Sequence, residues 1–514
     1  MLDNSMRDKL RSLFSELTAP ISFRVFASAH SKQAELIDFL EEIAALGTHL
    51  AVERTDEVSE IAGFALARNG EPLGIRFFGI PGGHEFTSLV LAILNADGQG
   101  KLPDAGIAKR MQALLRPIRL RTFVSLSCTN CPEVVQALNQ LALLSDNVTH
   151  DFIDGEVWTE EVDRLGIQGV PSVFEGDALL HSGKAGLGEL LAVLERRAGT
   201  AGVREQTVSE LYDILVLGGG PAGAAAAVYS ARKGLKTALT AERIGGQVND
   251  TAGIENLISI PTTDGASLSA ALSSHIDAYP IERFEDRRVE SVESDEEQRV
   301  VLQGGEVLRA KRLIVATGAK WRELGIPGER EYLGRGVAFC PHCDGPFFKG
   351  RRVAVVGGGN SGIEAAIDLA GICSHVTVLE FADTLKADRV LTDKLSSLSN
   401  TLVLLGVRTE AILGDGKKVT GIRFEHRASG AIETIELDGV FVQIGLVPSS
   451  ALLDGIVERN RFGEIVTDAA GRTSNPHIYA AGDVTTAPYK QIVVAMGQGA
   501  SAALAAFEDR MKSD

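Results

Sequence analysis

The sequence predicts a multidomain α/β protein, and three observations support that prediction. The chain of 514 residues is long enough for three or more domains that each bury a core. Residues 1–197 contain two similar halves, about 1–105 and 106–197, each with a strand, a helix, a second strand and a β-rich tail. A strand–glycine–helix pattern then begins near Tyr212 and again near Arg352, which predicts two Rossmann-like dinucleotide-binding domains.

The domain boundaries are predicted from composition and pattern. Residues 198–210 are small and polar without an apolar period, as is typical of a linker. We place the first part of one nucleotide-binding domain at 211–322, an inserted second domain at 323–438, and the remainder of the first domain at 439–514. One dinucleotide-binding domain is therefore expected to interrupt the other.

The formal net charge of -17 argues against nucleic acid and against an anionic membrane surface as partners. The N-terminus has no apolar signal region, and no run of apolar residues is long enough to span a bilayer. We therefore expect a cytoplasmic protein. Four of its five cysteines form two Cys-x-x-Cys pairs, which in a reducing compartment indicate redox or metal chemistry.

The first glycine pattern is Gly218-x-Gly220-x-x-Gly223 between an apolar strand and a helix of small residues. Gly218 permits the tight turn, Gly220 lets the backbone approach a pyrophosphate, and Gly223 lets the helix pack on the strand. The N-terminus of the helix adds free N–H groups for the phosphates. Glu242, at the end of the next strand, is expected to accept a hydrogen bond from a ribose hydroxyl.

The second pattern is Gly357-x-Gly359-x-x-Gly362, and Glu380 ends its second strand. An acid at that position repels a 2′-phosphate and binds a free 2′-hydroxyl, so the pattern favours NADH over NADPH. The alternative is that Glu380 merely faces solvent. The other candidate contacts of this nicotinamide site are Gly358, Asn360, Ser361, Ile444 and Gly445.

Two dinucleotide sites in one chain are typical of one flavin and one nicotinamide, so we expect the first pattern to bind FAD. Thr317 and Gly318 follow a buried strand where the backbone passes close to the flavin, and Asp483 is suited to ribityl hydroxyls. A helix that opens near Ile492 is suited to stabilise a reduced, anionic flavin. The remaining candidate FAD contacts are Pro221, Ala222, Gly246, Gln247, Asn256, Gly482, Lys490 and Gln491.

Cys340 and Cys343 lie between the two nucleotide patterns, and this position predicts a disulfide that exchanges electrons with the flavin. Asp344 is the candidate acid–base beside it, and His342 is expected to stabilise the thiolate locally. A zinc site is the alternative, but the other cysteine pair lies on a different predicted domain. No metal is therefore expected.

Cys128 and Cys131 stand where a strand enters a helix. The helix dipole favours thiolate there, which makes Cys128 the attacking thiol and Cys131 the buried resolving partner. The later Val170-Pro171 pair, often cis in this context, sets a backbone edge for a substrate chain. Together these features indicate a thioredoxin-like module, with two inert buried thiols as the alternative. The lone Cys373 is expected to be core.

His84 and Glu85 lie at a predicted helix start in the half without cysteines. We expect them to cap that helix, and the alternative is an acid–base role near Cys128.

Several segments resemble the flavoprotein component of bacterial alkyl hydroperoxide reductases over essentially the whole chain. They are GHEFTSLVLAIL, SLSCTNCPEVVQALN, GPAGAAAAVYSARKG, ATGAKWRELGIPGE, FCPHCDGPFFKG, GGGNSGIEAAIDLAG, FVQIGLVP and AAGDVTTAPYKQI. From about residue 211 onward the chain also looks like low-molecular-weight thioredoxin reductase.

The resemblance implies tandem thioredoxin-like folds before an FAD domain that is split by an NAD and disulfide domain. It implies a homodimeric, FAD-dependent NADH:peroxiredoxin disulfide oxidoreductase whose partner is a two-cysteine peroxiredoxin, the peroxidase component of the same alkyl hydroperoxide reductase system. By the same resemblance Cys343 faces the flavin, Cys340 is the interchange thiol, and Gln247 and Asn256 contact the flavin. Electrons then pass from Cys340–Cys343 to Cys128–Cys131 and on to the partner.

One position departs from the family, whose N-terminal motif is Cys-His-Asn-Cys where this chain has Thr129. A histidine at that position can be cationic and favour the thiolate, whereas threonine only forms hydrogen bonds. The pKa of Cys128 and its disulfide-exchange rate at neutral pH therefore depend on this position. Three other functions remain as alternatives. They are an NADPH-dependent thioredoxin reductase fused to its thioredoxin, a non-catalytic flavin-binding redox sensor, and a flavin monooxygenase, which has no use for the cysteines.

Overall fold

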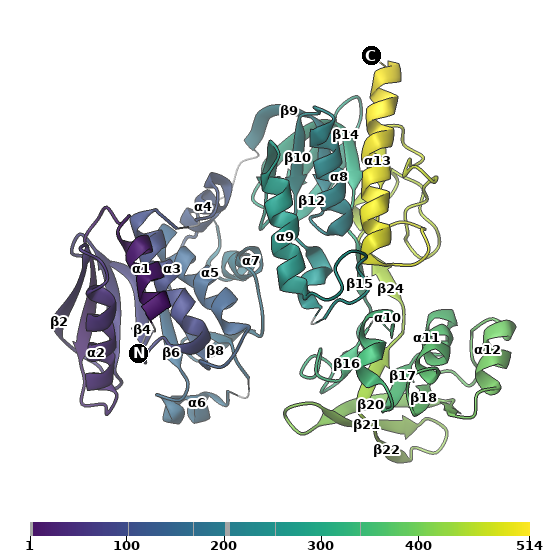
Figure 1. Cartoon of the computed structure of the whole chain (residues 1–514), viewed down its shortest axis with the longest axis horizontal. Helices are drawn as coiled ribbons and strands as arrows, with labels where there is room; N and C mark the ends of the chain where they lie inside the picture. Colours follow the sequence, from purple (N-terminus) through teal and green to yellow (C-terminus); the bar gives the residue numbers. More distant parts are fainter. Residues whose placement is uncertain are drawn as a thin grey trace. The chain divides into compact units, whose positions relative to one another are not determined.

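The computed structural model describes residues 4–100, 102–167, 169–200, 206–251, 253–339 and 341–513. The backbone alone is described for residues 206–209, 250, 342–343 and 513. The chain forms two compact units (Figure 1). The first consists of Met1–Thr207 with the short turn Leu302–Val307, and the second of Val208–Val301 and Leu308–Asp514.

The first unit is built on one eight-stranded sheet with the order β2-β1-β3-β4-β6-β5-β7-β8. In each half the first strand pairs parallel with the second and antiparallel with the third, so both halves repeat one topology. Parallel pairing of β4 with β6 joins the halves. The strands are β1 (Ile21–Ala27), β2 (Leu50–Val58), β3 (Gly63–Arg68), β4 (Glu71–Phe78), β5 (Ile118–Val124), β6 (Val148–Asp154), β7 (Ser172–Glu175) and β8 (Ala178–Ser182).

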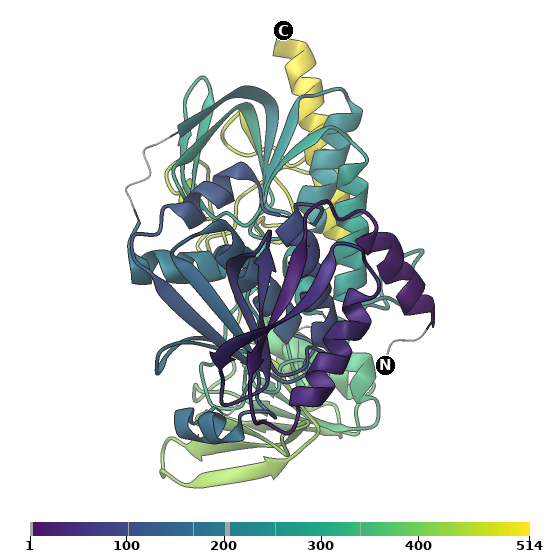
Figure 2. The same cartoon turned by 90° about the vertical axis from the view of Figure 1, so that its left-hand side faces the viewer.

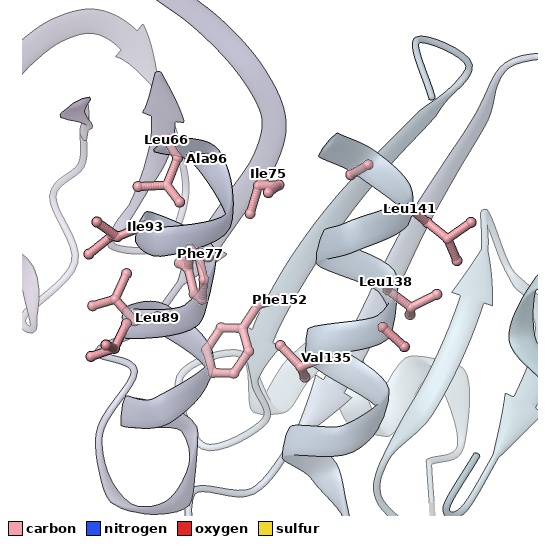
Figure 3. Packing of buried hydrophobic residues seen from close by; sticks show 14 of the residues in the cluster. Leu66, Ile75, Phe77, Leu89, Ile93, Ala96, Val135, Leu138, Leu141 and Phe152 are labelled. Carbon is pink, nitrogen blue, oxygen red and sulfur yellow. The ribbon is translucent and has the colours of Figure 1, made fainter. Parts of the chain in front are cut away.

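Helices α3 (Phe86–Asp97) and α5 (Cys131–Leu144) pack against each other over this sheet. Figure 3 shows Leu89 and Ile93 on α3 and Val135 on α5, with aromatic rings from the sheet between the two helices. Phe77 and Phe152 are register partners on β4 and β6, and their ring centroids are 5.3 Å apart. The core of the unit therefore runs across the junction of the halves. The other helices are α1 (Asn4–Phe14), α2 (Gln33–Ala44), α4 (Ala105–Gln112), α6 (Thr159–Leu165) and α7 (Leu187–Ala198).

The first sheet of the second unit has the order β11-β10-β9-β14-β13-β12, with β25 paired to β14. Helix α13 (Ile492–Ser513) lies along α8 (Pro221–Arg232), as Figures 1 and 2 both show. The end of the chain thus completes a domain that begins near its middle, which confirms the predicted split. The strands are β9 (Gln206–Leu217), β10 (Thr237–Thr240), β11 (Ile281–Phe284), β12 (Val289–Ser294), β13 (Gln298–Leu302), β14 (Glu306–Val315) and β25 (Ile478–Ala480). Helix α9 (Gly265–Asp277) follows β10.

The inserted domain has a parallel five-stranded sheet, ordered β16-β23-β17-β18-β19, and a three-stranded meander, β20-β21-β22. Its elements are β16 (Val337–Ala338), α10 (Pro341–Asp344), β17 (Arg352–Val356), α11 (Asn360–Ala370), β18 (His375–Leu379), α12 (Arg389–Ser396), β19 (Thr401–Leu404), β20 (Val407–Gly414), β21 (Val419–His426), β22 (Ile432–Glu436) and β23 (Gly439–Val442). The antiparallel pair β15 (Ala319–Trp321) and β24 (Leu446–Pro448) connects it to the first domain.

Two predicted segments differ from the structure. Strand β23 pairs with β17 through Val353 to Val356, so residues 439–442 belong to the inserted sheet and not to the final segment. Strand β9 begins at Gln206, inside the predicted linker. In the described part of the chain, no helix is both long and apolar enough to cross a bilayer.

Candidate active site

The N-terminal cysteine pair lies where β5 runs into α5. Cys128 and Cys131 are free thiols, the first partly exposed and the second buried as the first residue of α5. The Cys128 Sγ donates to the carbonyl oxygen of Val170 at 3.7 Å. The Val170–Pro171 peptide bond is cis. The arrangement therefore offers one accessible thiol, Cys128, beside a backbone edge. The buried thiol of Cys131 can act as the resolving partner.

A buried carboxyl lies near the buried thiol. Glu85 is 0% exposed. Burial raises its pKa to about 7, against an opposing contribution from the Ser88 hydroxyl. Burial, then the neighbouring Cys128 and the charge of Glu85, raise the pKa of Cys131. A carboxyl whose pKa lies near neutrality is suited to exchange a proton with such a thiol.

The loop that carries Glu85 is fastened to the loop that carries Cys128. The backbone N–H of His84 donates to the Leu126 carbonyl at 3.1 Å. A Cβ on Gly83, which has a φ of +56°, would lie 2.5 Å from the same oxygen, so only glycine fits there. Glu85 forms no side-chain cap on α3, and the capping role expected for it is wrong. Burial beside another half of the unit leaves no signal in the local sequence.

The exposed residues around Cys128 are polar. Thr129 and Asn130 are exposed between the two cysteines. Glu133 in the first turn of α5 forms an ion pair of 3.2 Å with Lys184. An acid near a helix N-terminus stabilises the helix but opposes a nearby thiolate, and Lys184 offsets that charge.

The first glycine pattern has the geometry of a pyrophosphate cradle. A Cβ on Gly218 would collide with the Ala316 carbonyl, and one on Gly223 would collide with the Gly218 carbonyl. A Cβ on Gly220 would meet nothing nearer than the Gly245 oxygen at 4.0 Å. The outer glycines thus pack backbone on backbone, while the middle glycine faces open space at the start of α8. This is the arrangement that a dinucleotide needs.

The second glycine pattern repeats the same geometry. A Cβ on Gly357 would collide with the Gln443 carbonyl, and one on Gly362 with the Gly357 carbonyl. Gly359 has no atom within 4 Å of the position of a Cβ. The residues therefore fit a second dinucleotide at the N-terminus of α11.

The strand-end acids of the two patterns differ in their partners. Glu242 accepts from Arg288 Nη2 at 2.9 Å and from its Nε at 3.2 Å. Glu380 accepts from the backbone N–H groups of Gly358 at 2.5 Å and Ala382 at 2.7 Å. Glu380 is thus fixed beneath its glycine loop and does not merely face solvent. Arg288 lies far from Glu242 in the sequence, and no local pattern signals it.

Further candidate FAD residues gather around the first cradle. A Cβ on Gly246 would lie 3.2 Å from Gly220 Cα, and one on Gly482 would lie 2.9 Å from Ala222 Cβ. Pro221 is the first residue of α8. The segments that begin at Gly246 and Gly482 therefore flank the start of α8.

A second group of candidates is joined by hydrogen bonds. Asn256 Nδ2 donates to Gln491 Oε1 at 3.1 Å, and Gln247 Nε2 donates to the Ala319 carbonyl at 2.5 Å. Lys490 Nζ lies 3.1 Å from Glu464. Ile492 is the first residue of α13. The start of α13 is thereby tied to the loop that carries Asn256.

Asp483 follows Gly482 and is partly buried. Burial raises the pKa of its carboxyl, and the charge of Lys490 acts in the opposite direction. Thr317 Oγ1 donates to the Ser449 carbonyl at 2.7 Å, and the Gly318 carbonyl accepts from the Ser449 N–H at 2.9 Å. Thr317 and Gly318 therefore lie where the connection between the domains passes.

The remaining nicotinamide candidates surround the second cradle. Asn360 and Asp388 exchange two hydrogen bonds of 2.8 and 2.9 Å, which close the loop after β18 over the start of α11. Ser361 is the second residue of that helix. The Ile444 methyl lies 3.5 Å from the position of a Gly357 Cβ. The Gly445 carbonyl accepts from the Arg322 N–H at 3.0 Å.

The second cysteine pair is mostly beyond what the structure describes. Cys340 lies outside the described residues, and the side chains of Cys343 and His342 are not described. Asp344 ends α10. Cys373 is buried and donates to the Phe348 carbonyl at 3.4 Å, and burial raises its pKa to about 11. Its predicted place in the core is confirmed.

Two dinucleotide cradles in one unit, with a strand-end dithiol in the other, define a flavin-dependent pyridine nucleotide-disulphide oxidoreductase. Residues 212–499 match the family described as pyridine nucleotide-disulphide oxidoreductase. The thioredoxin reductase from Streptococcus pyogenes MGAS5005 has a similar structure, with a TM-score of 0.56 and 33% sequence identity. The match covers 59% of this chain and 100% of that one.

Relatives that match the whole chain identify the family within this class of oxidoreductases. The chain is 47% identical over 516 residues to the alkyl hydroperoxide reductase F protein of Pseudomonas putida, and the match covers 100% of this chain and 99% of that protein. It is 45% identical over 508 residues to a Bacillus subtilis (strain 168) protein named NADH dehydrogenase, with 99% of each covered. The chain belongs to the alkyl hydroperoxide reductase F family. It is an oxidoreductase whose cofactors are FAD and NAD(P)H.

Proposed function

We propose that this chain takes electrons from NADH and delivers them through two cysteine pairs to a two-cysteine peroxiredoxin, which then reduces hydroperoxides. The arrangement at Cys128 carries the proposal. Its thiol is partly exposed beside the Val170 carbonyl, while Cys131 is buried behind it. An accessible thiol with a buried partner is what exchange with a protein disulfide requires.

The proposed order begins at the second unit. FAD held at the cradle of Gly218, Gly220 and Gly223 would supply a hydride acceptor for the nicotinamide and an electron-pair donor for a disulfide. The Cys340–Cys343 disulfide becomes a dithiol, and Cys340 attacks the Cys128–Cys131 disulfide to form a mixed disulfide. Cys343 then attacks Cys340, which releases the Cys128–Cys131 dithiol and re-forms the Cys340–Cys343 disulfide. Each of the two exchanges breaks one S–S bond and forms another, and together they move one electron pair between the cysteine pairs. Asp344 is the proposed proton donor and acceptor at Cys343.

The last exchange uses the first unit alone. Cys128 attacks the disulfide of the peroxiredoxin and forms a mixed disulfide, and one partner thiolate leaves. Cys131 then attacks Cys128, which releases the second partner thiol and closes the Cys128–Cys131 disulfide. Cys131 must lose its proton for that attack. Glu85 is a buried carboxyl that interacts with this thiol from the cysteine-free half, and we assign it the proton.

The choice of NADH over NADPH rests on Glu380. Its carboxylate is held at the end of β18 by two backbone N–H groups. A negative charge fixed there opposes a 2′-phosphate and leaves lone pairs for a 2′-hydroxyl. The name of the Bacillus subtilis relative, an NADH dehydrogenase, agrees with this choice.

We also propose a homodimer formed through the second unit. Ile258 and Tyr489 are each 79% exposed, and they flank the Asn256–Gln491 hydrogen bond beside the proposed flavin site. Large exposed apolar side chains at one place are typical of an interface. Sedimentation of the FAD-loaded chain as a monomer would refute the dimer.

The decisive experiment follows NADH oxidation with a two-cysteine peroxiredoxin and an organic hydroperoxide. We expect turnover with the wild type and with Cys373→Ser, which removes a buried thiol outside the relay. Cys128→Ser should abolish peroxide turnover, while NADH still reduces the flavin of this variant. Unchanged peroxide turnover in Cys128→Ser would refute the relay.

The nearest rival is a thioredoxin reductase fused to its own thioredoxin. That enzyme would prefer NADPH and would reduce many disulfide proteins. Comparison of NADH with NADPH, and of peroxiredoxin with free thioredoxin as acceptor, separates the two functions.

A further inference from the structure

An exposed aromatic ring lies directly beside the acid that ends β18. Phe381 follows Glu380 and is 57% exposed. The guanidinium carbon of Arg427 lies 4.2 Å from the centroid of its ring, so one face of the ring is covered by a planar cation. More than half of the residue is still exposed, which leaves ring surface for a planar ligand. Stacked aromatic and guanidinium groups are how proteins commonly hold a nucleobase.

Arg427 is held in this position by the fold. It lies in the turn between β21 and β22, and its backbone N–H donates to the Gly406 carbonyl at 2.9 Å. Its Nη1 donates to the Phe381 carbonyl at 2.8 Å. The same nitrogen lies 3.6 Å from the carboxylate of Asp383, which is itself 87% exposed. The stack therefore joins the meander to the loop after β18.

The place of the stack relative to the glycine cradle indicates its ligand. In a Rossmann domain the pyrophosphate lies at the glycine loop and the adenosine ribose lies at the acid that ends the second strand. Here those two points are tied together, because Glu380 accepts from the Gly358 N–H. The base on that ribose must then lie beside the residue that follows Glu380. That residue is Phe381.

The charges around the stack bear on which dinucleotide fits. A 2′-phosphate on the same ribose would be stabilised by a nearby cation. Arg427 is such a cation, because its guanidinium contacts the residue after Glu380. Asp383 holds that guanidinium in an ion pair. Lys386 is a second cation on the same loop, with an exposed side chain and a backbone N–H that donates to the Gly358 carbonyl. Any test must therefore separate the attraction of Arg427 for a 2′-phosphate from that of Lys386.

We propose that Phe381 and Arg427 form the adenine platform of the nicotinamide site, and that Asp383 makes the site select NADH by holding the charge of Arg427. The inference rests on the proposed use of NADH and adds these residues to Glu380. Phe381 binds the base. Asp383 acts through Arg427 and is a positioning residue.

The test measures binding and not turnover. Dissociation constants of NAD⁺ and NADP⁺ are determined by calorimetry on the oxidised, FAD-loaded full chain. We expect Phe381→Ala to weaken NAD⁺ binding about tenfold, which is the usual loss of one base stack, and Phe381→Tyr to retain it. Phe462→Ala is the matched control, because Phe462 is 63% exposed with the Arg461 guanidinium 4.7 Å from its ring but lies at no strand-end acid.

A double-mutant cycle tests the selectivity. Asp383→Ala should strengthen NADP⁺ binding about fivefold, as expected for freeing one exposed cation, and should leave NAD⁺ binding within about twofold. This increase in NADP⁺ affinity should be absent when Asp383→Ala is introduced into the Arg427→Ala variant. A gain that persists there would show that Asp383 acts by its own charge or through Lys386 and would overturn the selectivity claim.

Failure of the platform is distinct from failure of the relay. Wild-type affinity for NAD⁺ in Phe381→Ala, with Phe381→Tyr and Phe462→Ala also unchanged, would overturn the platform. Peroxide turnover measured on the same preparations would still report on Cys128 and its partner.

Discussion

Glu85 and Cys131 come from different halves of the first unit, yet both are 0% exposed and interact electrostatically. The half without cysteines therefore contributes a residue to the chemistry of the other half. The contact is possible because β4 and β6 join the two halves into one sheet and α3 packs on α5.

The first prediction concerns this carboxyl. With the pKa of Glu85 at about 7, the fraction able to accept a proton from Cys131 rises as pH increases through neutrality. Reduction of a small disulfide reagent by NADH should show this inflection in the wild type. Glu85→Gln should lose the inflection and slow the reaction at pH 8 about a hundredfold, the usual worth of one acid–base group.

Glu133→Gln is the control, because it removes a carboxylate from the same site at an exposed position. We expect it to keep the inflection. The assignment of Glu85 fails if the Glu85→Gln variant retains the wild-type pH profile.

Thr129 gives a second prediction. It is exposed between the two cysteines, so a larger side chain fits there without repacking. Thr129→His should speed the attack of Cys128 on a disulfide several-fold at pH 6, where the imidazolium is charged and favours the thiolate. The gain should shrink by pH 8, and Thr129→Ser should behave like the wild type. The rate of disulfide exchange at Cys128 is measured by stopped flow at both pH values. An equal increase in rate at pH 6 and pH 8 would contradict the electrostatic cause.

The sequence predicts the residues whose roles depend on local geometry. Both glycine patterns have their predicted packing because a tight turn, an open middle position and a helix start lie within a few residues of one another. The alternation of strand and helix likewise predicts the fold class and the interrupted domain. The position of Cys131 at the start of a helix is likewise predicted from neighbouring residues alone.

Contacts between distant segments have no such signal. Glu85 is a helix-start acid by pattern, and only its burial against the other half distinguishes it. Arg288 and Arg427 reach their carboxylates across strands that the topology brings together. The domain predicted for strand β23 is wrong, because sheet membership is decided by pairing with β17 and not by position along the chain.

The third prediction separates the glycines of the first cradle. Gly220→Ala places a methyl group in open space at the start of α8, so the flavin-free variant should unfold at the midpoint of the flavin-free wild type but should no longer bind flavin. Gly223→Ala drives a methyl group into the Gly218 carbonyl and should lower the midpoint of the second unit by several degrees, as expected for about 2 kcal/mol of strain. The ratio of flavin to protein absorbance and the unfolding midpoint report the two effects. Equal behaviour of the two variants would contradict the cradle.

The last prediction concerns a buried histidine in the core beneath the cysteine helix. His150 is 0% exposed and lies between Asn139 and Thr122, with contacts of 2.7 Å from Nδ1 and 2.8 Å from Nε2. Burial lowers the pKa of His150 to about 4. The unfolded chain takes up the proton near its ordinary pKa of 6.5, whereas the folded chain does not. Stability is therefore present above pH 6.5 and is lost as the pH falls toward 4.

Between pH 7 and pH 5 this residue should cost the first unit about 2 kcal/mol of unfolding free energy. Because the chain has two tryptophans, Trp321→Phe leaves Trp158 as the fluorescent reporter of the first unit. Urea midpoints at the two pH values should differ markedly in that background and much less after His150→Gln, which does not titrate. Other groups contribute equally to both proteins, so the difference isolates His150. Parallel loss of stability in both proteins would assign the acid sensitivity to those other groups.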